Sequence, residues 1–251
     1  MKTLSAHQPV YLPSVMLFNK IALCDCFVFL SHVQFVGRSW QQRNRIRGGG
    51  GEALFLSVPV RKKGRRFQAI SETVIANDED WRRKHLASLR QAYGKRPYFD
   101  FYFPRLEAVI ARPWLSLCDL DIALIGELAA CLDIRTPLLD SRDLHPEGHA
   151  NAMLISLCRE LGADRYVSNI GSSAYIDESA FAAAGIRHLW QNFQFPRYDQ
   201  GAPFLDRLSV VDLLFNVGPA ARSIILAAGD LTEHLDQVAD LSDPETAMEG
   251  Q

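Results

Sequence analysis

The sequence predicts an α/β fold: a parallel-sheet core that opens with a βαβ unit and carries an inserted basic hairpin and a helical segment. Two observations favour this fold class. Short apolar runs of strand length alternate with helix-length segments along most of the chain, which is typical of an α/β sheet. Gly162 and Gly185 each follow such a segment where a glycine commonly ends a helix. The composition, with 48% hydrophobic and 22% charged residues, is that of an ordinary globular protein.

The first elements are expected to be a strand, a helix and a second strand. Residues 2–6 form the first strand, and two prolines then delay the helix to residues 15–24, with Ser14 as its N-cap. The apolar run at residues 26–33 is the second strand. Two strands joined by one helix pair in parallel through a right-handed crossover.

Polar residues follow both of these strands. His7 and Gln8 come directly after the first strand, and Gln34 comes after the second. Because functional residues of such units lie at the carboxyl ends of the strands, we expect these three side chains at one site, together with Arg43 and Asn44 of the following segment. Histidine titrates near neutral pH, so His7 is the first candidate for acid–base catalysis. The alternative is a histidine that only caps the strand by hydrogen bonds.

The next segment is expected to be a hairpin with a glycine tip. Residues 48–51 are all glycine and separate the arms at 40–47 and 52–60. The remaining elements alternate. Further strands are expected at residues 70–75, 136–140, 165–168 and 187–191, and helices at 80–93, 104–111, 115–132, 150–161 and 178–184. We expect one domain over residues 1–226 and an acidic tail over residues 227–251.

The positive charge is concentrated in and after this hairpin. Residues 37–66 contain nine basic residues and one acidic residue, which leaves a net charge of −10 on the rest of the chain. A solvated loop tolerates such a run. The alternative is an anion site, because arginine binds phosphate and carboxylate in bidentate fashion. Trp40, Arg43, Asn44 and Arg45 would then supply stacking, an amide and two guanidinium groups. The same basic and aromatic side chains could also bind the phosphates and bases of RNA. The overall charge of −2 and the lack of a ribonucleoprotein motif disfavour a nucleic-acid ligand.

Several other classes are disfavoured. The five cysteines are odd in number and match no zinc or redox spacing, so we expect free thiols in a reducing cytoplasm. No signal peptide and no apolar run of membrane-spanning length is found. His145 and His149 lie in a loop without an evident third ligand, so no metal site is expected. No phosphate-binding P-loop, dinucleotide fingerprint or nucleophile elbow occurs, and the sequence identifies no cofactor.

Several motifs together resemble one known family. They are His7-Gln8-Pro9-Val10-Tyr11-Leu12-Pro13, Phe18-x-Lys20-Ile21, Val33-Gln34-Phe35, Trp40 with Arg43-Asn44-Arg45-Ile46, Val58-Pro59-Val60, Trp81 with Lys84-His85-Leu86, Tyr93, Tyr166-Val167-Ser168, Gly171 with Tyr175, Tyr198-Asp199-Gln200, and the run from Leu208 to Gly218. This set is similar to the WbqC-like protein family over residues 3–220. The resemblance implies a protein encoded in bacterial surface-polysaccharide and O-antigen gene clusters.

The chain departs from the family pattern at a few positions. Ser31 and His32 stand where acidic residues are expected, Gln42 replaces an asparagine, and Asn169 replaces a glycine. If the acidic pair binds a metal in relatives, this chain has lost that metal or changed its substrate.

The expected function is group transfer in the synthesis of surface-polysaccharide precursors. The group is acyl, aminoacyl or nucleotidyl, and the substrate is an anionic small molecule such as a phosphate or a nucleotide-activated sugar. A similar order of strand, histidine turn and helix opens nucleotidyltransferases of the HIGH type, although His7-Gln8-Pro9 is not their motif. The alternative is a non-catalytic module that binds glycan or nucleotide in a biosynthetic complex.

The expected roles follow from this reading. His7 is the general base or a phosphate contact, Gln8 and Gln34 orient the substrate, and the arginines of the hairpin bind the anion. The expected catalytic residues are His7, Gln8, Gln34 and His85, and the expected substrate-binding residues are Tyr11, Trp40, Arg43, Asn44, Arg45, Lys84, Tyr93, Ser168, Gly171, Tyr175, Asp212 and Asn216.

Asp212 is expected to be paired; the alternative is a helix that only seals the sheet and leaves Asp212 exposed. Its spacing of four from Asn216 puts both on one face of a helix, among apolar neighbours. A carboxylate in that position needs an arginine, a histidine or backbone N–H groups as partners.

Overall fold

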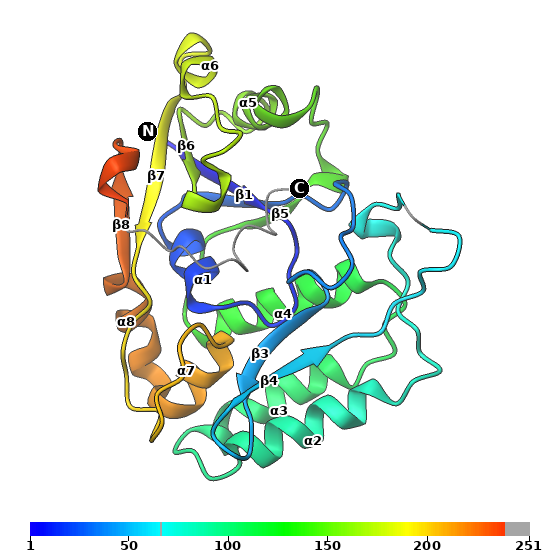
Figure 1. Cartoon of the computed structure of the whole chain (residues 1–251). Coiled ribbons are helices and arrows are strands. Elements are labelled where there is room, and N and C mark those ends of the chain that lie inside the picture. Colours follow the sequence, from blue (N-terminus) through cyan, green and yellow to red (C-terminus); the bar gives the residue numbers. More distant parts are fainter. Residues whose placement is uncertain (66, 239–251) are drawn as a thin grey trace.

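A computed structural model describes residues 1–65 and 67–238 and confirms the α/β fold class (Figure 1). The main sheet has six strands in the order β5-β2-β1-β6-β7-β8. The first five pair in parallel, and β8 is antiparallel to β7. Their bounds are β1 Thr3–His7, β2 Cys26–Phe29, β5 Leu138–Asp140, β6 Arg165–Ser168, β7 Arg187–Phe193 and β8 Gly229–Thr232.

The two faces of the sheet carry separate hydrophobic cores. On one face, Leu4 and Ala6 of β1 pack with α5 (Ala150–Glu160) and α6 (Glu178–Ala183). On the other face, Phe27 and Phe29 of β2 belong to a larger core. That core is shared with α1 (Val15–Ala22), α2 (Trp81–Tyr93), α3 (Phe99–Ile110), α4 (Leu117–Cys131), α7 (Val210–Val217) and α8 (Ala221–Ala227). Alternation along the strands therefore gives each face its own set of apolar side chains.

A second, two-stranded sheet lies apart from the main one. Strands β3 (Arg43–Arg47) and β4 (Ala53–Ser57) are antiparallel and lie beside the α2–α4 segment in Figure 1. Ile46 and Leu56 face the larger core, whereas Arg43 and Arg45 lie on the opposite face of β3. The pair is joined by the glycine-rich turn.

The order of the strands creates a switch point at β1. From β1 the chain runs outward through β2 to β5, and it then returns to the other side of β1 to form β6, β7 and β8. The crossovers on the two sides place helices on opposite faces, which leaves a crevice beyond the carboxyl ends of β1 and β6. In open α/β sheets this crevice is where ligands bind.

Three elements differ from the sequence-based expectation. Residues 70–75 were expected as a strand, but Ile70–Glu72 forms a 3-10 turn and only isolated bridges follow. Helix α3 begins at Phe99 and contains Pro104, which was expected to start it. Residues 229–232 were placed in the tail, but they form β8 in the main sheet. Arg66 of the basic run and residues 239–251 of the expected tail lie outside the described residues.

One described stretch, Val210–Ala227, is long and apolar enough to cross a membrane, with a mean hydropathy of 1.5. Half of it is buried inside the fold, as in the core helices of soluble proteins, which pass the same test. Gly218, with a φ of 56°, interrupts it between α7 and α8. The stretch is therefore weak support for a membrane span.

Candidate functional site

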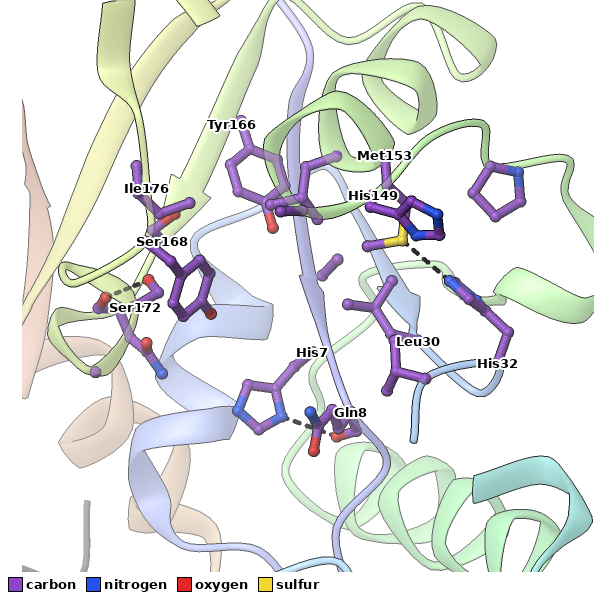
Figure 2. A pocket seen from close by; sticks show the side chains of 18 of the residues that line it. His7, Gln8, Leu30, His32, His149, Met153, Tyr166, Ser168, Ser172 and Ile176 are labelled. Atoms are coloured by element: carbon purple, nitrogen blue, oxygen red, sulfur yellow. Dashed lines mark hydrogen bonds between the residues drawn. The ribbon is translucent and has the colours of Figure 1, made fainter. Parts of the chain in front are cut away.

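A pocket of about 590 Å³ lies at the switch point of the sheet (Figure 2). Its walls come from the carboxyl ends of β1 and β6, the segment after β2, and the start of α5. The lining residues are Ala6, His7, Gln8, Lys20, Leu30, His32, Val33, Pro146, Gly148, His149, Ala150, Met153, Leu154, Tyr166, Ser168, Asn169, Gly171, Ser172, Tyr175 and Ile176. Its volume is in the range of small-molecule sites.

His7 ends β1 and faces the pocket with a fixed tautomer. Its Nδ1 lies 2.8 Å from the backbone oxygen of Gln8 (Figure 2). Because a carbonyl oxygen can only accept, Nδ1 carries the hydrogen, and Nε2 of the neutral ring is then an acceptor. The side chain of Gln8 is held in turn, since its Oε1 accepts a hydrogen bond from Nε2 of Gln41.

Nitrogen-bearing side chains dominate the pocket. Lys20 of α1 is only 4% exposed, and its ammonium group donates to the backbone oxygen of Ala6 at 3.1 Å. His32 follows β2 with Nδ1 2.7 Å from Oγ of Ser141, and burial lowers its pKa. His149 is the N-cap residue of α5. The described lining residues include no aspartate or glutamate.

The opposite wall supplies hydroxyl and amide groups. Ser168 ends β6, and the short turn after it contributes Asn169, Gly171 and Ser172. Oγ of Ser172 donates to the backbone oxygen of Asn169 at 2.7 Å, which braces this turn (Figure 2). Tyr175 closes the same side. Such groups both donate and accept, as the hydroxyls of a sugar do.

The structure brings five of the expected site residues to the pocket: His7, Gln8, Ser168, Gly171 and Tyr175. Two segments about 160 residues apart in the sequence therefore meet at one place. Gln34 does not line the pocket; it is exposed and pairs with Ala69 in an isolated bridge. The expected convergence of Gln34, Arg43 and Asn44 with His7 is thus not seen in the lining.

Tyr11, Asn44 and His85 lie in the core. The Tyr11 hydroxyl is 2.8 Å from Nδ1 of His85, and the amide of Asn44 donates to the backbone oxygen of Tyr11. Burial lowers the pKa of His85 to about 4. These side chains connect α2 and β3 to the segment after β1, and none of the three lines the pocket. Lys84, one residue before, is exposed on α2.

Asp212 is fully buried and hydrogen-bonded, as expected, but by different partners. Its Oδ1 accepts from the Tyr198 hydroxyl at 2.9 Å and from the amide of Asn216 at 3.3 Å. Tyr93 also contacts this carboxylate, and its hydroxyl accepts the backbone N–H of Arg47. Burial raises the pKa of Asp212. Tyrosine hydroxyls replace the expected arginine, histidine or backbone N–H groups, because their rings also fill the apolar surroundings.

Trp40, Arg43 and Arg45 form a strip with Phe55 on one face of the β3–β4 pair. The guanidinium of Arg43 lies 4.5 Å from the Phe55 ring centre, and that of Arg45 lies 5.6 Å from the Trp40 ring centre. Trp40 and Phe55 stack at 6.1 Å. None of these residues lines the pocket, although the Gln41–Gln8 bond joins the start of the strip to it.

Sequence reasoning missed several lining residues. Lys20 carries a charge within the apolar helix α1, and that contrast alone could have indicated it. His32 lies three residues after the end of β2, close to the kind of position that identified His7. His149 was considered only as a metal ligand. Tyr166 and Asn169 become neighbours of His7 only through the pairing of β1 with β6.

No three His, Cys, Asp or Glu side chains among residues 1–65 and 67–238 lie close enough to hold a metal ion. All five cysteines are free thiols, and all except Cys131 are buried.

Comparison with known proteins identifies the family. A model of the WbqC-like protein family matches residues 8–224. The chain belongs to the WbqC-like protein family. A relative from Mycobacterium tuberculosis, named "Uncharacterized protein Rv1507c", is 32% identical over 224 residues, which cover 88% of this chain and 96% of that protein. No solved structure matches.

The match to the WbqC-like family covers both sides of the pocket, from Gln8 to the turn after β6. Two of the departures from the family pattern, His32 and Asn169, line this pocket. Ser31 does not line it; its backbone N–H donates to Oγ of Ser141.

Proposed function

We propose that this WbqC-like protein transfers an acyl, aminoacyl or nucleotidyl group to or from a nucleotide-activated sugar. The observation that carries the proposal is a pocket at the switch point with one lysine and three histidines and no carboxylate among its described lining residues. A ligand with phosphate groups fits that balance of charge. The hydroxyl and amide groups of the opposite wall suit its sugar.

Lys20 is the main phosphate contact. Its ammonium group is buried at the end of β1, where the surrounding protein strengthens its attraction for an anion relative to water. A helix and a backbone carbonyl hold it in place, so a ligand need not order a flexible side chain.

His7 is the general base of the proposed reaction. The acceptor's oxygen or nitrogen attacks the carbonyl carbon or phosphorus of the donor, and the leaving group departs with the bonding electron pair. Nε2 of His7 takes the acceptor's proton and passes it to the leaving group. The bond from Nδ1 to the Gln8 backbone keeps Nε2 in the accepting form.

The pathway and the location are part of the same proposal. The setting that we propose, surface-polysaccharide and O-antigen precursor synthesis, is the one that the sequence resemblance to the WbqC-like family implies. The five free thiols support a reducing compartment, the cytoplasm.

A second candidate is a non-catalytic binding module. One observation favours it: Nδ1 of His7 bonds to a backbone carbonyl. A carboxylate in that place would make the ring a stronger base. Binding of the sugar nucleotide would be the same in both cases, but turnover would be absent.

Titration calorimetry with UDP-glucose, UDP and inorganic phosphate tests binding. We expect Lys20→Met to weaken the binding of UDP-glucose by about tenfold or more, because it removes the buried charge and keeps the aliphatic stem. Lys84→Met, on the exposed face of α2, is the matched control and should bind as the unaltered protein does. Equal affinities of the two variants would rule out the pocket.

His7→Gln separates the two candidates. In the enzyme it abolishes turnover of UDP-glucose mixed with acyl and amine acceptors, followed by ³¹P and ¹H NMR, and leaves the affinity within a small factor. Turnover by His7→Gln at the original rate would remove His7 as the base, and no turnover by either protein would favour the binding module.

A further inference from the structure

Ser168 and His188 meet directly behind the wall of the pocket. Ser168 ends β6 opposite Trp190 of β7, and His188 lies two residues before Trp190 on the same face of the sheet. The Nε2 atom of His188 is 2.9 Å from Oγ of Ser168. Ser168 lines the pocket, whereas His188 does not, so the serine is the only one of the pair within the described lining.

The surroundings of His188 keep its ring neutral. The ring is 8% exposed and lies 5.2 Å from the Phe181 ring and 4.6 Å from the Trp190 ring, centre to centre. Burial lowers the pKa of His188 to about 4, although the nearby Glu178 opposes this shift. The Glu178 carboxylate accepts the indole N–H of Trp190 at 2.6 Å.

The neutral ring has one hydrogen, and the structure indicates where it lies. Nδ1 of His188 is buried and has no hydrogen-bond partner among the described residues. A buried N–H without an acceptor is rarer and less favourable than a lone pair without a donor. The hydrogen therefore lies on Nε2, which donates to Oγ of Ser168. The Ser168 hydroxyl hydrogen is then directed to a different acceptor.

We propose that the Ser168 hydroxyl donates a hydrogen bond to a phosphate or sugar oxygen of the ligand, and that His188 is the positioning residue that sets its direction. The proposal rests on the proposed function, because it assumes a sugar nucleotide in this pocket. It assigns Ser168 to binding, since a nucleophilic serine would need the opposite tautomer, in which Nε2 accepts the hydroxyl hydrogen.

The first test needs no ligand. Long-range ¹H–¹⁵N spectra of the protein labelled at histidine distinguish a protonated Nε2 from a protonated Nδ1. We expect the His188 signals, assigned by their loss in His188→Gln, to report a protonated Nε2 and an unprotonated Nδ1. A protonated Nδ1 would overturn the donor role of Ser168.

The second test uses the affinity for UDP-glucose. Ser168→Ala should weaken binding by about fivefold to tenfold, the effect of one neutral hydrogen bond. His188→Gln places an amide N–H where Nε2–H stood and should bind within about twofold of the original. His188→Leu lacks a donor and should lose as much as Ser168→Ala, with no further loss in the double variant.

The matched control is His85→Leu, which removes an equally buried histidine from outside the pocket and should leave the affinity unchanged. If His188→Leu does not fold, His188→Gln and Ser168→Ala still decide the matter. Full affinity in Ser168→Ala overturns the proposal. Labelling of Ser168 by a fluorophosphonate probe, lost in His188→Gln, also overturns it and makes the serine a nucleophile.

The two proposals fail in different ways. If neither UDP-glucose nor inorganic phosphate binds the unaltered protein, the proposed function and the donor role fall together. If UDP-glucose binds but the NMR spectra show a protonated Nδ1, only the donor role falls.

Discussion

His85 lies between α2 and the segment after β1, with Trp81 and Tyr11 against its ring. The Trp81 ring is 5.2 Å away, and the Tyr11 hydroxyl bonds to Nδ1. A charged imidazolium in this place would lose its hydration, which is why burial lowers the pKa of His85. The residue therefore holds the core together in its neutral form.

This burial makes stability depend on pH. The pKa of His85 is about 4 in the folded protein and 6.5 in an ordinary setting. Between these values the unfolded chain binds a proton that the folded chain does not. The stabilisation that neutral His85 adds to the free energy of unfolding is therefore complete above pH 6.5 and is lost as the pH falls toward 4. The loss is on the order of 3 kcal/mol.

Urea denaturation of the unaltered protein and His85→Gln, at several pH values from 7 to 4, measures this effect. The difference in the free energy of unfolding should shrink as the pH falls, because the variant has no imidazole at this place. A difference that stays constant with pH would show that His85 titrates as it does in the unfolded chain.

At the scale of secondary-structure elements, Asp212 joins α7 to α2 and to the loop before α7. Tyr198 and Asn216 donate to its carboxylate, and Tyr93 of α2 contacts it. We expect Asp212→Ala to lower the free energy of unfolding by about 2–4 kcal/mol, because it leaves several buried polar groups without a partner. Tyr198→Phe removes one bond and should cost about 1 kcal/mol. Chemical denaturation measures both, and equal costs would mean that the carboxylate is not the centre of this joint.

The arginine strip on β3 and the loop after β4 are expected to differ in role. Arg43 is partly buried against Phe55, whereas Lys62 and Lys63 are exposed. Arg43→Ala should lower the affinity for UDP-glucose by about 2–4 kcal/mol, since the strip begins beside Gln8 of the pocket and offers a fixed guanidinium. Neutralising Lys62 and Lys63 together should weaken binding only slightly, and mostly at low salt.

Calorimetry at low and high salt separates the two segments. Equal losses from both changes that vanish together at high salt would mean that residues 38–65 act as one diffuse electrostatic surface. A loss confined to Arg43→Ala at both salt concentrations would support an extended site that reaches from the pocket to the strip.

Apolar runs and helix-ending glycines in the sequence predicted most of the strands and helices correctly. Arg165–Ser168 forms β6 as expected, and the first two strands and the later helices differ only at their ends. Pro104 lies inside α3, where Phe99 stacks on Phe103 within the helix and packs against the distant Phe215 of α7; these contacts outweigh one lost backbone bond. Strand β8 has no apolar alternation, and only its pairing with β7 makes it a strand.

At the scale of the whole molecule, the sequence predicted the part of the pocket that follows β1 but not most of the residues that other strands bring to it. The rule that function lies at strand ends identified His7 and Gln8 from the sequence. The strand order that puts β6, rather than the hairpin, next to β1 has no local signal. For that reason His32, Tyr166 and Asn169 were missed, and Gln34 was expected where it does not lie.

The extent of the domain can be tested by truncation. We propose that the structural domain includes β8, since its four residues pair with Trp190 to Phe193 of β7. A chain of residues 1–226 should be less stable than a chain of residues 1–238 by about 2 kcal/mol or more, because β7 becomes an exposed edge. Thermal denaturation and size-exclusion chromatography measure the stability and any aggregation. Equal behaviour of the two chains would place the boundary at residue 226.

The central position of β1 also has a consequence for synthesis on the ribosome. β1 leaves the ribosome first, but its neighbour β6 begins more than 150 residues later in the sequence. One edge of β1 therefore stays unpaired until β6 has been synthesised. Contacts this distant in sequence are slow to form, and an unpaired strand edge invites association with other chains. The wall from Tyr166 to Ile176 emerges only when most of the protein has been made. The nascent chain therefore has its sheet half built, and no complete pocket, until late in translation.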